Sequence, residues 1–216
     1  MTTSTDTKSR LIEAARELFL SQGYTATGIA QILKAAKARS GSLYYFFPAK
    51  EDLLLAVLET YKDMLWPVVI QPVFDRVSDP IERIFGVLDG YRRMLQYTEC
   101  SQGCPIGNLA LELGESQHVA RRLISENFTA WREAIRQCLD DAADRFAGDV
   151  DTEQLALFVL TTMEGAVMLA RSYRGIEAYD TAVKLLRDYF DRLMDDGTKR
   201  TRSQRPTRRV KRKRRN

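Results

Sequence analysis

With 216 residues, of which 44% are hydrophobic and 29% charged, the chain has the composition of a soluble globular protein. Its longest nearly apolar stretch, residues 53–57, is too short to cross a bilayer, and the first ten residues lack the apolar region of a secretory signal. Three cysteines, an odd number, argue against a disulfide framework. We therefore expect a cytoplasmic protein that does not enter a membrane.

The formal net charge of +4 hides an uneven distribution. Residues 1–50 carry seven Lys and Arg against three Asp and Glu, whereas residues 51–196 carry fifteen against twenty-six. Residues 197–216 carry eleven basic residues and no acidic one. An acidic middle between two basic ends indicates that the ends bind a polyanion, and nucleic acid is the expected partner.

Apolar spacing and the scarcity of Pro and Gly predict an all-α chain. In chain order we expect helices over 8–22, 27–36, 39–46, 50–65, 68–77, 80–97, 105–114, 117–145, 151–173 and 178–195. Gly23 is placed to end the first helix, and the hydroxyl of Thr27 to cap the second. Pro67 is among the residues expected to interrupt the helices. The last twenty residues show no apolar periodicity and are expected to form a disordered basic tail.

Two short helices separated by about three residues make residues 23–54 a candidate helix-turn-helix. Ile29, Ile32 and Leu33 give the first helix one buried side, and Leu43 and Phe47 supply the matching apolar positions of the second. The second helix begins with small or hydrogen-bonding residues, which let a backbone approach DNA closely. In this motif the second helix enters the major groove.

The run SGSLYYFFPAKEDLL at residues 40–54, with Gly23, Tyr24 and Thr27 upstream, resembles the signature of the TetR/AcrR family of repressors. The resemblance covers residues 10–58. It implies an N-terminal three-helix DNA-binding module at residues 1–50, which contains the helix-turn-helix. It also implies a larger helical ligand-binding and dimerisation domain at residues 51–196, and a repressor that a small molecule releases from its operator.

The resemblance also implies which residues contact the phosphates of double-stranded DNA, and side-chain chemistry indicates which ones contact its bases. Phosphate contacts are expected from Thr27, Ser42, Tyr44 and Lys50, and contacts to base edges from Arg39, Ser40 and Tyr45. Lys37 and Gly41 complete the expected interface. The family usually has Gly in the turn where this chain has Lys37, and a Lys in a left-handed turn costs roughly 1 kcal/mol.

One recognition helix reads too few bases for a genomic address, so we expect a homodimer on half-sites about 34 Å apart. The last two long helices carry apolar stripes that would pair across a two-fold axis as a four-helix bundle. The expected interface residues are Phe158, Thr162, Gly165, Ala166, Leu186, Tyr189 and Phe190. The alternative is that these stripes face the core of their own subunit.

Aromatic residues and methionines are frequent over residues 61–131, which favours a pocket for an apolar or aromatic effector. The alternative is that most of them form plain core. The expected ligand contacts are Tyr61, Met64, Trp66, Phe85, Tyr91, Met94, Phe128 and Trp131, with polar contacts from Cys104, Asn108 and Glu112.

The segment GCPIGNLALE at residues 103–112 resembles a helix start found in one TetR subgroup. Pro105 at the first helical position places Cys104 at the N-cap, where the helix dipole favours a thiolate. This raises a second hypothesis, a repressor that senses electrophiles or oxidants through Cys104; the alternative is a buried structural cysteine. Cys100 and Cys104 make a poor metal pair, because His118 is the single histidine and Cys138 is distant. We expect no metal and no cofactor.

Three other classes of protein are alternatives to a ligand-responsive repressor. An enzyme is disfavoured, because no catalytic Ser-His-acid order, phosphate-binding Gly loop or metal cluster is present. A protein that binds nucleic acid without sequence preference would use the basic tail alone. An activator of the same fold is the third alternative.

Overall fold

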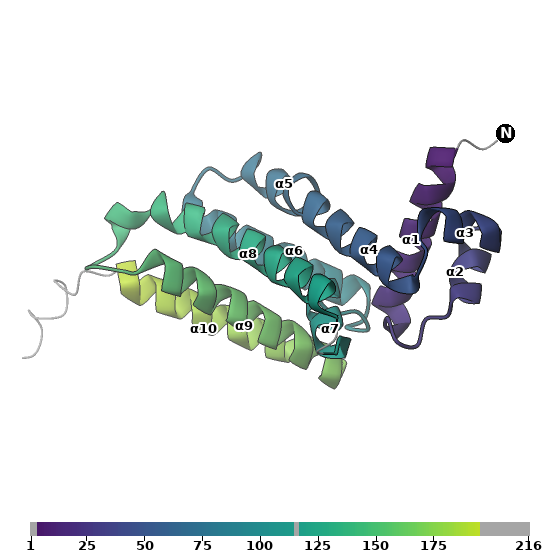
Figure 1. The fold of residues 1–216 in the computed structure, drawn as a ribbon. Helices are drawn as coiled ribbons and strands as arrows, with labels where there is room; N and C mark the ends of the chain where they lie inside the picture. The colour runs from purple at the N-terminus through teal and green to yellow at the C-terminus, as the bar shows by residue number, and fades with distance from the viewer. Residues whose placement is uncertain (1–3, 115–116, 195–216) are drawn as a thin grey trace, which may run out of the picture.

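The computed structural model describes residues 4–114 and 117–194; the predicted basic tail lies outside these residues. Within the described part every regular element is a helix, which confirms the predicted all-α class. Figure 1 shows a small head of three helices at one end of a longer body of stacked helices. Here "the head" means residues 4–46 and "the body" residues 50–194.

The head is built from α1 (Ser4–Gln22), α2 (Ile29–Ala35) and α3 (Ser40–Phe46). Leu11, Ala15 and Phe19 of α1 follow one another at helical spacing and are buried against Ile32 and Leu43. As predicted, α1 stops at Gly23. This residue has φ +92°, and its N–H donates to the carbonyl of Phe19 at 3.0 Å.

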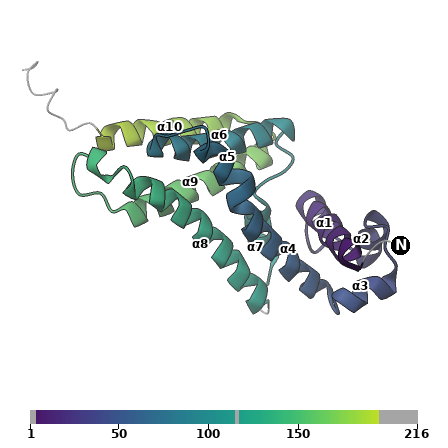
Figure 2. The same ribbon diagram turned by 90° about the horizontal axis from the view of Figure 1, so that it is seen from above.

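The first helix of the body is α4 (Lys50–Met64), which follows the head directly and which Figure 2 shows leading from α3 into the helical stack. The predicted break at Pro67 was wrong, because α4 continues into a π-helix over Leu65–Ile70 and then into α5 (Gln71–Phe74). The N–H of Gln71 donates to the carbonyl of Trp66, five residues earlier. This wider turn accommodates Pro67, which has no N–H to donate, without ending the helical path.

The middle of the body contains α6 (Pro80–Tyr97), α7 (Pro105–Glu112) and α8 (His118–Asp140). The carboxylate of Asp79 caps α6 by accepting from the N–H groups of Ile81 and Glu82. Asn127 of α8 is buried, and its amide donates to the carbonyl of Leu58 at 3.1 Å, which ties α8 to α4. A short 3₁₀ turn at Ala143–Arg145 follows α8.

The body ends in α9 (Thr152–Tyr173) and α10 (Glu177–Met194), which run side by side beneath α6 and α8 in Figure 1. The buried hydroxyl of Tyr179 donates to the carbonyl of Leu88 at 2.7 Å, which anchors α10 to α6. Phe190 packs edge-on against Phe85 with ring centroids 5.4 Å apart. By length and composition α9 could also span a membrane, but one side of it, with Leu155, Val159 and Met163, is buried in the core of the body.

Candidate DNA interface and effector cavity

The turn between α2 and α3 adopts the left-handed conformation predicted for it. Lys37 has φ +49°, and the N–H of Ala38 donates to the carbonyl of Leu33 at 3.0 Å. This closes the end of α2 and directs the chain into α3. The two helices are therefore held as a helix-turn-helix, with Ala36 buried beneath the turn.

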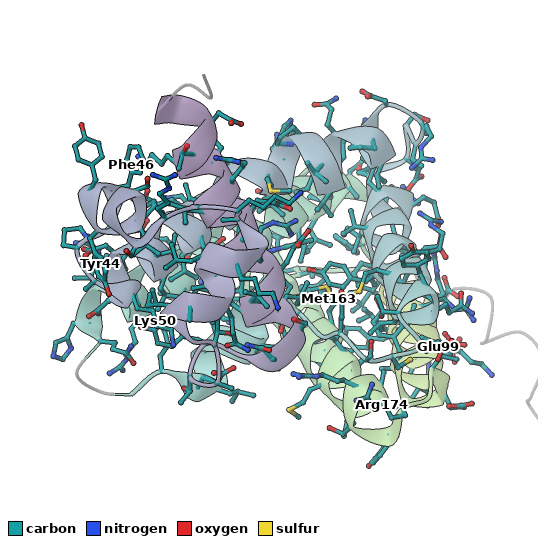
Figure 3. All side chains as sticks on the ribbon, turned by 90° about the vertical axis from the view of Figure 1, so that its right-hand side faces the viewer. Tyr44, Phe46, Lys50, Glu99, Met163 and Arg174 are labelled. Atoms are coloured by element: carbon teal, nitrogen blue, oxygen red, sulfur yellow. The ribbon has the colours of Figure 1, made fainter. Side chains whose placement is uncertain are left out.

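One side of α3 is buried and the other is open to solvent. As predicted, Leu43 and Phe47 lie in the core. Tyr44 and Tyr45 are 54% and 78% exposed, which is unusual for side chains of this size. Ser42 is half-buried, and four further residues of the expected interface are exposed: Lys37, Arg39, Ser40 and Gly41. Figure 3 shows Tyr44 and Phe46 at the outer edge of the head.

Thr27 departs from its predicted roles. Its side chain is buried, and its hydroxyl donates to the carbonyl of Gly23 at 2.6 Å. The residue that caps α2 is Gly28, whose N–H donates to the side chain of Gln31 at 2.7 Å. The prediction that Thr27 caps the helix was therefore wrong. The burial of Thr27 does not support its predicted contact with a DNA phosphate.

Lys50 is half-buried at the start of α4. Its Nζ donates to the carbonyl of Tyr24 at 2.5 Å and lies 4.2 Å from the centre of the Tyr24 ring. Burial lowers the pKa of Lys50, and the carboxylate of Glu112 acts in the opposite direction. Lys50 thus fixes α4 to the turn between α1 and α2, a role that sequence reasoning missed. Its phosphate contact stays a prediction that rests on the remaining ammonium protons.

Glu112 was predicted to bind the ligand, and the structure places it elsewhere. It lies at the end of α7, where its Oε2 accepts from the backbone N–H of Thr25 in the head at 3.0 Å. The carboxylate sits so close to Gly23 that a Cβ there would lie 2.6 Å from Oε1. Glu112 therefore connects α7 to the α1–α2 turn, next to the contact that Lys50 makes with Tyr24.

A cavity of about 510 Å³ lies beside α7. This volume is within the range of small-molecule sites. We call it the α7 cavity; α7, α8 and α9 line it, and its walls are mainly apolar. The lining residues are Gly103, Cys104, Gly107, Asn108, Ala110, Leu111, Phe128, Leu157, Leu160, Thr161, Glu164, Gly165, Val167 and Met168.

A second cavity of about 360 Å³ lies on the other side of the segment that leads into α7. It reaches from Arg16 and Leu20 of α1 to the π-helix, α5 and α6, and Gly103 is common to both cavities. Tyr61 is at its wall, and the Tyr61 hydroxyl is buried without a hydrogen-bond partner. Burial raises the pKa of Tyr61 to about 12, and the neighbouring Arg16 only partly opposes this shift, so the hydroxyl is neutral.

Some of the residues predicted to bind the ligand line the α7 cavity, others line the second cavity, and the rest line neither. Cys104, Asn108 and Phe128 line the α7 cavity, whereas Tyr61, Tyr91 and Met94 line the second. The other predicted contacts lie away from both cavities. Met64 and Trp66 line neither, Phe85 packs on Phe190 beside a separate pocket of about 300 Å³, and Trp131 borders a crevice of about 20 Å³. Sequence reasoning missed the α9 wall of the α7 cavity, although Glu164 is the one charged residue between Glu153 in the first turn of α9 and Arg171 in its last.

Cys104 is the N-cap of α7, as predicted, and its sulfur accepts from the N–H of Gly107 at 3.4 Å. The thiol is 3% exposed, and this burial, together with the charge of Glu164, raises the pKa of Cys104 far above its usual range. Burial therefore outweighs the helix dipole, and the thiol stays protonated. This contradicts the expected thiolate and favours the structural interpretation of Cys104.

Only some of the residues predicted to form the dimer interface are exposed to solvent. Phe158 and Tyr189 are 49% and 44% exposed and pack against each other with centroids 5.6 Å apart. Thr162 and Gly165, which lie on α9 with Phe158, are half-buried. Ala166, Leu186 and Phe190 are buried in the core of their own subunit, so assigning them to the interface was wrong. Further exposed apolar residues on these helices are Leu157, Met168, Leu169, Tyr173 and Leu185.

Comparison with known proteins agrees with this architecture. The model of bacterial regulatory proteins of the tetR family matches residues 11–57, and that of the tetracyclin repressor-like C-terminal domain matches residues 80–186. The HTH-type transcriptional regulator YxaF of Bacillus subtilis is 33% identical over 171 residues, which cover 79% of this chain and 87% of that protein. The HTH-type transcriptional repressor DhaR of Mycobacterium sp. (strain GP1) is 26% identical over 178 residues, 82% of this chain and 88% of that protein.

Among solved structures, the regulatory protein TetR from Rhodobacter sphaeroides superposes with a TM-score of 0.76 at 26% identity. The match covers 82% of this chain and 95% of that one, so it includes both the head and the body. Among the described residues, no group of three or more His, Cys, Asp or Glu side chains is arranged to hold a metal ion. The two matched domains and these relatives show that the chain belongs to the TetR family and is a helix-turn-helix transcriptional regulator.

Proposed function

We propose that the protein is a dimeric, cytoplasmic repressor that binds a palindromic operator and releases it when a small, mainly apolar effector enters the body. Residues 1–50 would read DNA and residues 51–196 would hold the effector and form the dimer. The observation that carries the proposal is the position of α7. One face of this helix lines a cavity, and its last residue, Glu112, holds a turn of the DNA-binding head.

Operator reading is supported by the exposed side of α3. Arg39 at its N-cap can donate two hydrogen bonds to guanine in the major groove, and Tyr45 is exposed on the same helix. Ser40 and the N-terminal backbone of α3 offer hydrogen bonds to base edges and phosphates. Apart from its chain neighbours and the backbone of α3, no atom lies within 4 Å of where a Cβ on Gly41 would be, so this part of α3 is open to an approaching duplex.

Dimerisation is supported by the exposed apolar side of α9 and α10. Phe158 and Tyr189 form its aromatic centre, and Leu169 and Leu185 are also exposed there. Contiguous apolar surface on a soluble protein marks an interaction site. A second copy would cover this surface and place two α3 helices on successive major grooves.

Release of the operator is explained by α7, which lines the effector cavity and contacts the head through its last residue. An effector that fills the α7 cavity contacts Asn108 and Leu111 on this helix, and a shift of α7 moves Glu112 against Thr25. The head would then change its angle to the body, and the two recognition helices would no longer match their half-sites. Such coupling typically changes operator affinity by 1–3 kcal/mol.

The test is to select bound sequences from random duplex DNA with the purified full-length protein. We expect one palindromic site, with half-sites about one helical turn apart. Arg39→Ala should relax the base preference at one position of each half-site. Arg122→Ala removes the same charge from an exposed site on α8 and should leave the preference unchanged. Recovery of unrelated sequences would contradict the proposal.

The same selection tests the alternative of binding without sequence preference. Deleting residues 198–216 removes eleven basic residues. If α3 reads the operator, the truncated protein should select the same site with a weaker dependence of affinity on salt. Loss of all binding on truncation would show that the tail, not α3, binds the nucleic acid.

A further inference from the structure

The α7 cavity contains a carboxyl group without a charge partner. Glu164 projects from α9 into this cavity, and its Oε1 is buried without any hydrogen bond. Its Oε2 lies against α7 at Gly107, where a Cβ would be only 2.5 Å away. The missing side chain at Gly107 thus makes room for the carboxyl group beside the helix.

The neighbouring groups do not neutralise Glu164. Arg171, two turns further along α9, donates to Oδ1 of Asn108 at 2.7 Å and has no ion pair with Glu164 among the described contacts. The Cys104 thiol is protonated and contributes only a hydrogen bond to the carboxyl group. Along α9 the wall near Glu164 is mainly apolar, with Leu160, Val167 and Met168 beside the hydroxyl of Thr161. On α7 the amide Nδ2 of Asn108 is a further buried polar atom without a hydrogen bond.

A buried carboxylate is costly unless a cation or hydrogen-bond donors satisfy it. A ligand that brings a positively charged donor to Oε1 recovers this cost, and an apolar ligand body is matched to the remaining wall. A neutral apolar ligand of the same shape would leave the carboxyl group unsatisfied. The cavity therefore discriminates between ligands by their charge.

We propose that the α7 cavity binds an apolar organic cation, with a protonated amine donating to Glu164. This deepens the proposed function by naming the chemical class of the effector. Binding at the cavity itself does not depend on operator binding. Glu164 sets the charge preference of the site, and the aliphatic residues of α9 with Phe128 of α8 hold the apolar part of the ligand.

The test compares 4-phenylbutylamine with 4-phenylbutanol, which have similar shapes but differ in charge. Isothermal titration calorimetry of the full-length protein at neutral pH should show the amine binding at least tenfold tighter than the alcohol. Glu164→Gln should weaken amine binding at least tenfold and change alcohol binding less than twofold. A thermal unfolding curve establishes that this variant is folded.

The matched control is Glu153→Gln on the same helix. Its side chain is 65% exposed, and the substitution removes the same charge from the protein surface, so amine affinity should not change. The proposal is overturned if the amine does not bind, if amine and alcohol bind equally, or if Glu164→Gln leaves amine affinity unchanged.

Operator binding separates this inference from the proposed function. If the amine binds through Glu164 and weakens binding to the selected operator, both stand. If the amine binds through Glu164 and operator affinity does not change, the cation site stands and the role of this cavity in induction fails. If no operator is selected, the regulatory proposal fails, while the calorimetric comparison still decides the cation site.

Discussion

At Lys37 a lysine occupies a backbone conformation that favours glycine, with φ +49°. Replacing Lys37 with Gly removes the steric cost of its Cβ in this conformation. We expect Lys37→Gly to raise the free energy of unfolding by about 1 kcal/mol, measured by urea denaturation followed by circular dichroism. Lys34→Gly, three residues earlier within α2, should lower it by about 1 kcal/mol. A loss of stability in both variants would show that the Lys37 side chain itself stabilises the turn.

Glu164 predicts a pH dependence of stability. Burial raises the pKa of Glu164, and the hydrogen bond from Cys104 only partly opposes this. The native protein therefore keeps this proton at pH values where the unfolded chain has lost it. As a result, the group reduces stability as pH rises from its unfolded pKa through its folded pKa.

Glu164→Gln removes this effect because the amide does not ionise. Without ligand, the melting temperature of the variant should exceed that of the natural protein at about pH 8, and the difference should shrink towards zero near pH 4. Differential scanning calorimetry across this pH range measures the melting temperatures of the variant and of the natural protein. A difference that is constant with pH would mean that Glu164 titrates normally.

At the scale of elements, α7 is the short helix that connects the cavity to the head. Glu112→Ala removes the acceptor of the Thr25 N–H at 3.0 Å, whereas Glu112→Gln retains an acceptor oxygen. We expect the alanine variant to lose about 1 kcal/mol of stability and to exchange the Thr25 amide proton faster. Hydrogen exchange of the peptide covering residues 23–28 measures this, with Glu112→Gln as the control. Equal protection in all three proteins would show that the contact does not hold the turn.

At the scale of the whole molecule, the α9–α10 surface decides the oligomeric state. An Arg at position 158 would place an unpaired charge in the aromatic centre of the expected interface. Phe158→Arg should therefore halve the mass measured by size exclusion with light scattering. Tyr97→Arg changes a residue that is 91% exposed on α6, away from this surface, and should keep the natural mass. An unchanged mass for Phe158→Arg would place the interface elsewhere.

The sequence by itself determined the helices and much of the head. Most helix ends were predicted within a few residues, because Gly23, Asp79 and Pro105 act on backbone groups only a few positions away. The burial of Leu43 and Phe47 followed from helical spacing, and the N-cap role of Cys104 from the proline after it. Signals that act within one or two turns can be read from the chain alone.

Only the tertiary structure decided which side chains meet across the fold. Thr25 and Glu112 are 87 positions apart, and no local pattern indicates that they touch. From helical periodicity Phe158 and Phe190 were both expected in the dimer interface, yet Phe158 is exposed while Phe190 lies in the core. Likewise, Glu164 faces a cavity because α7 and α9 leave space beside Gly107. Periodicity shows that a helix has an apolar side, but the packing of several helices decides whether that side meets core, cavity or solvent.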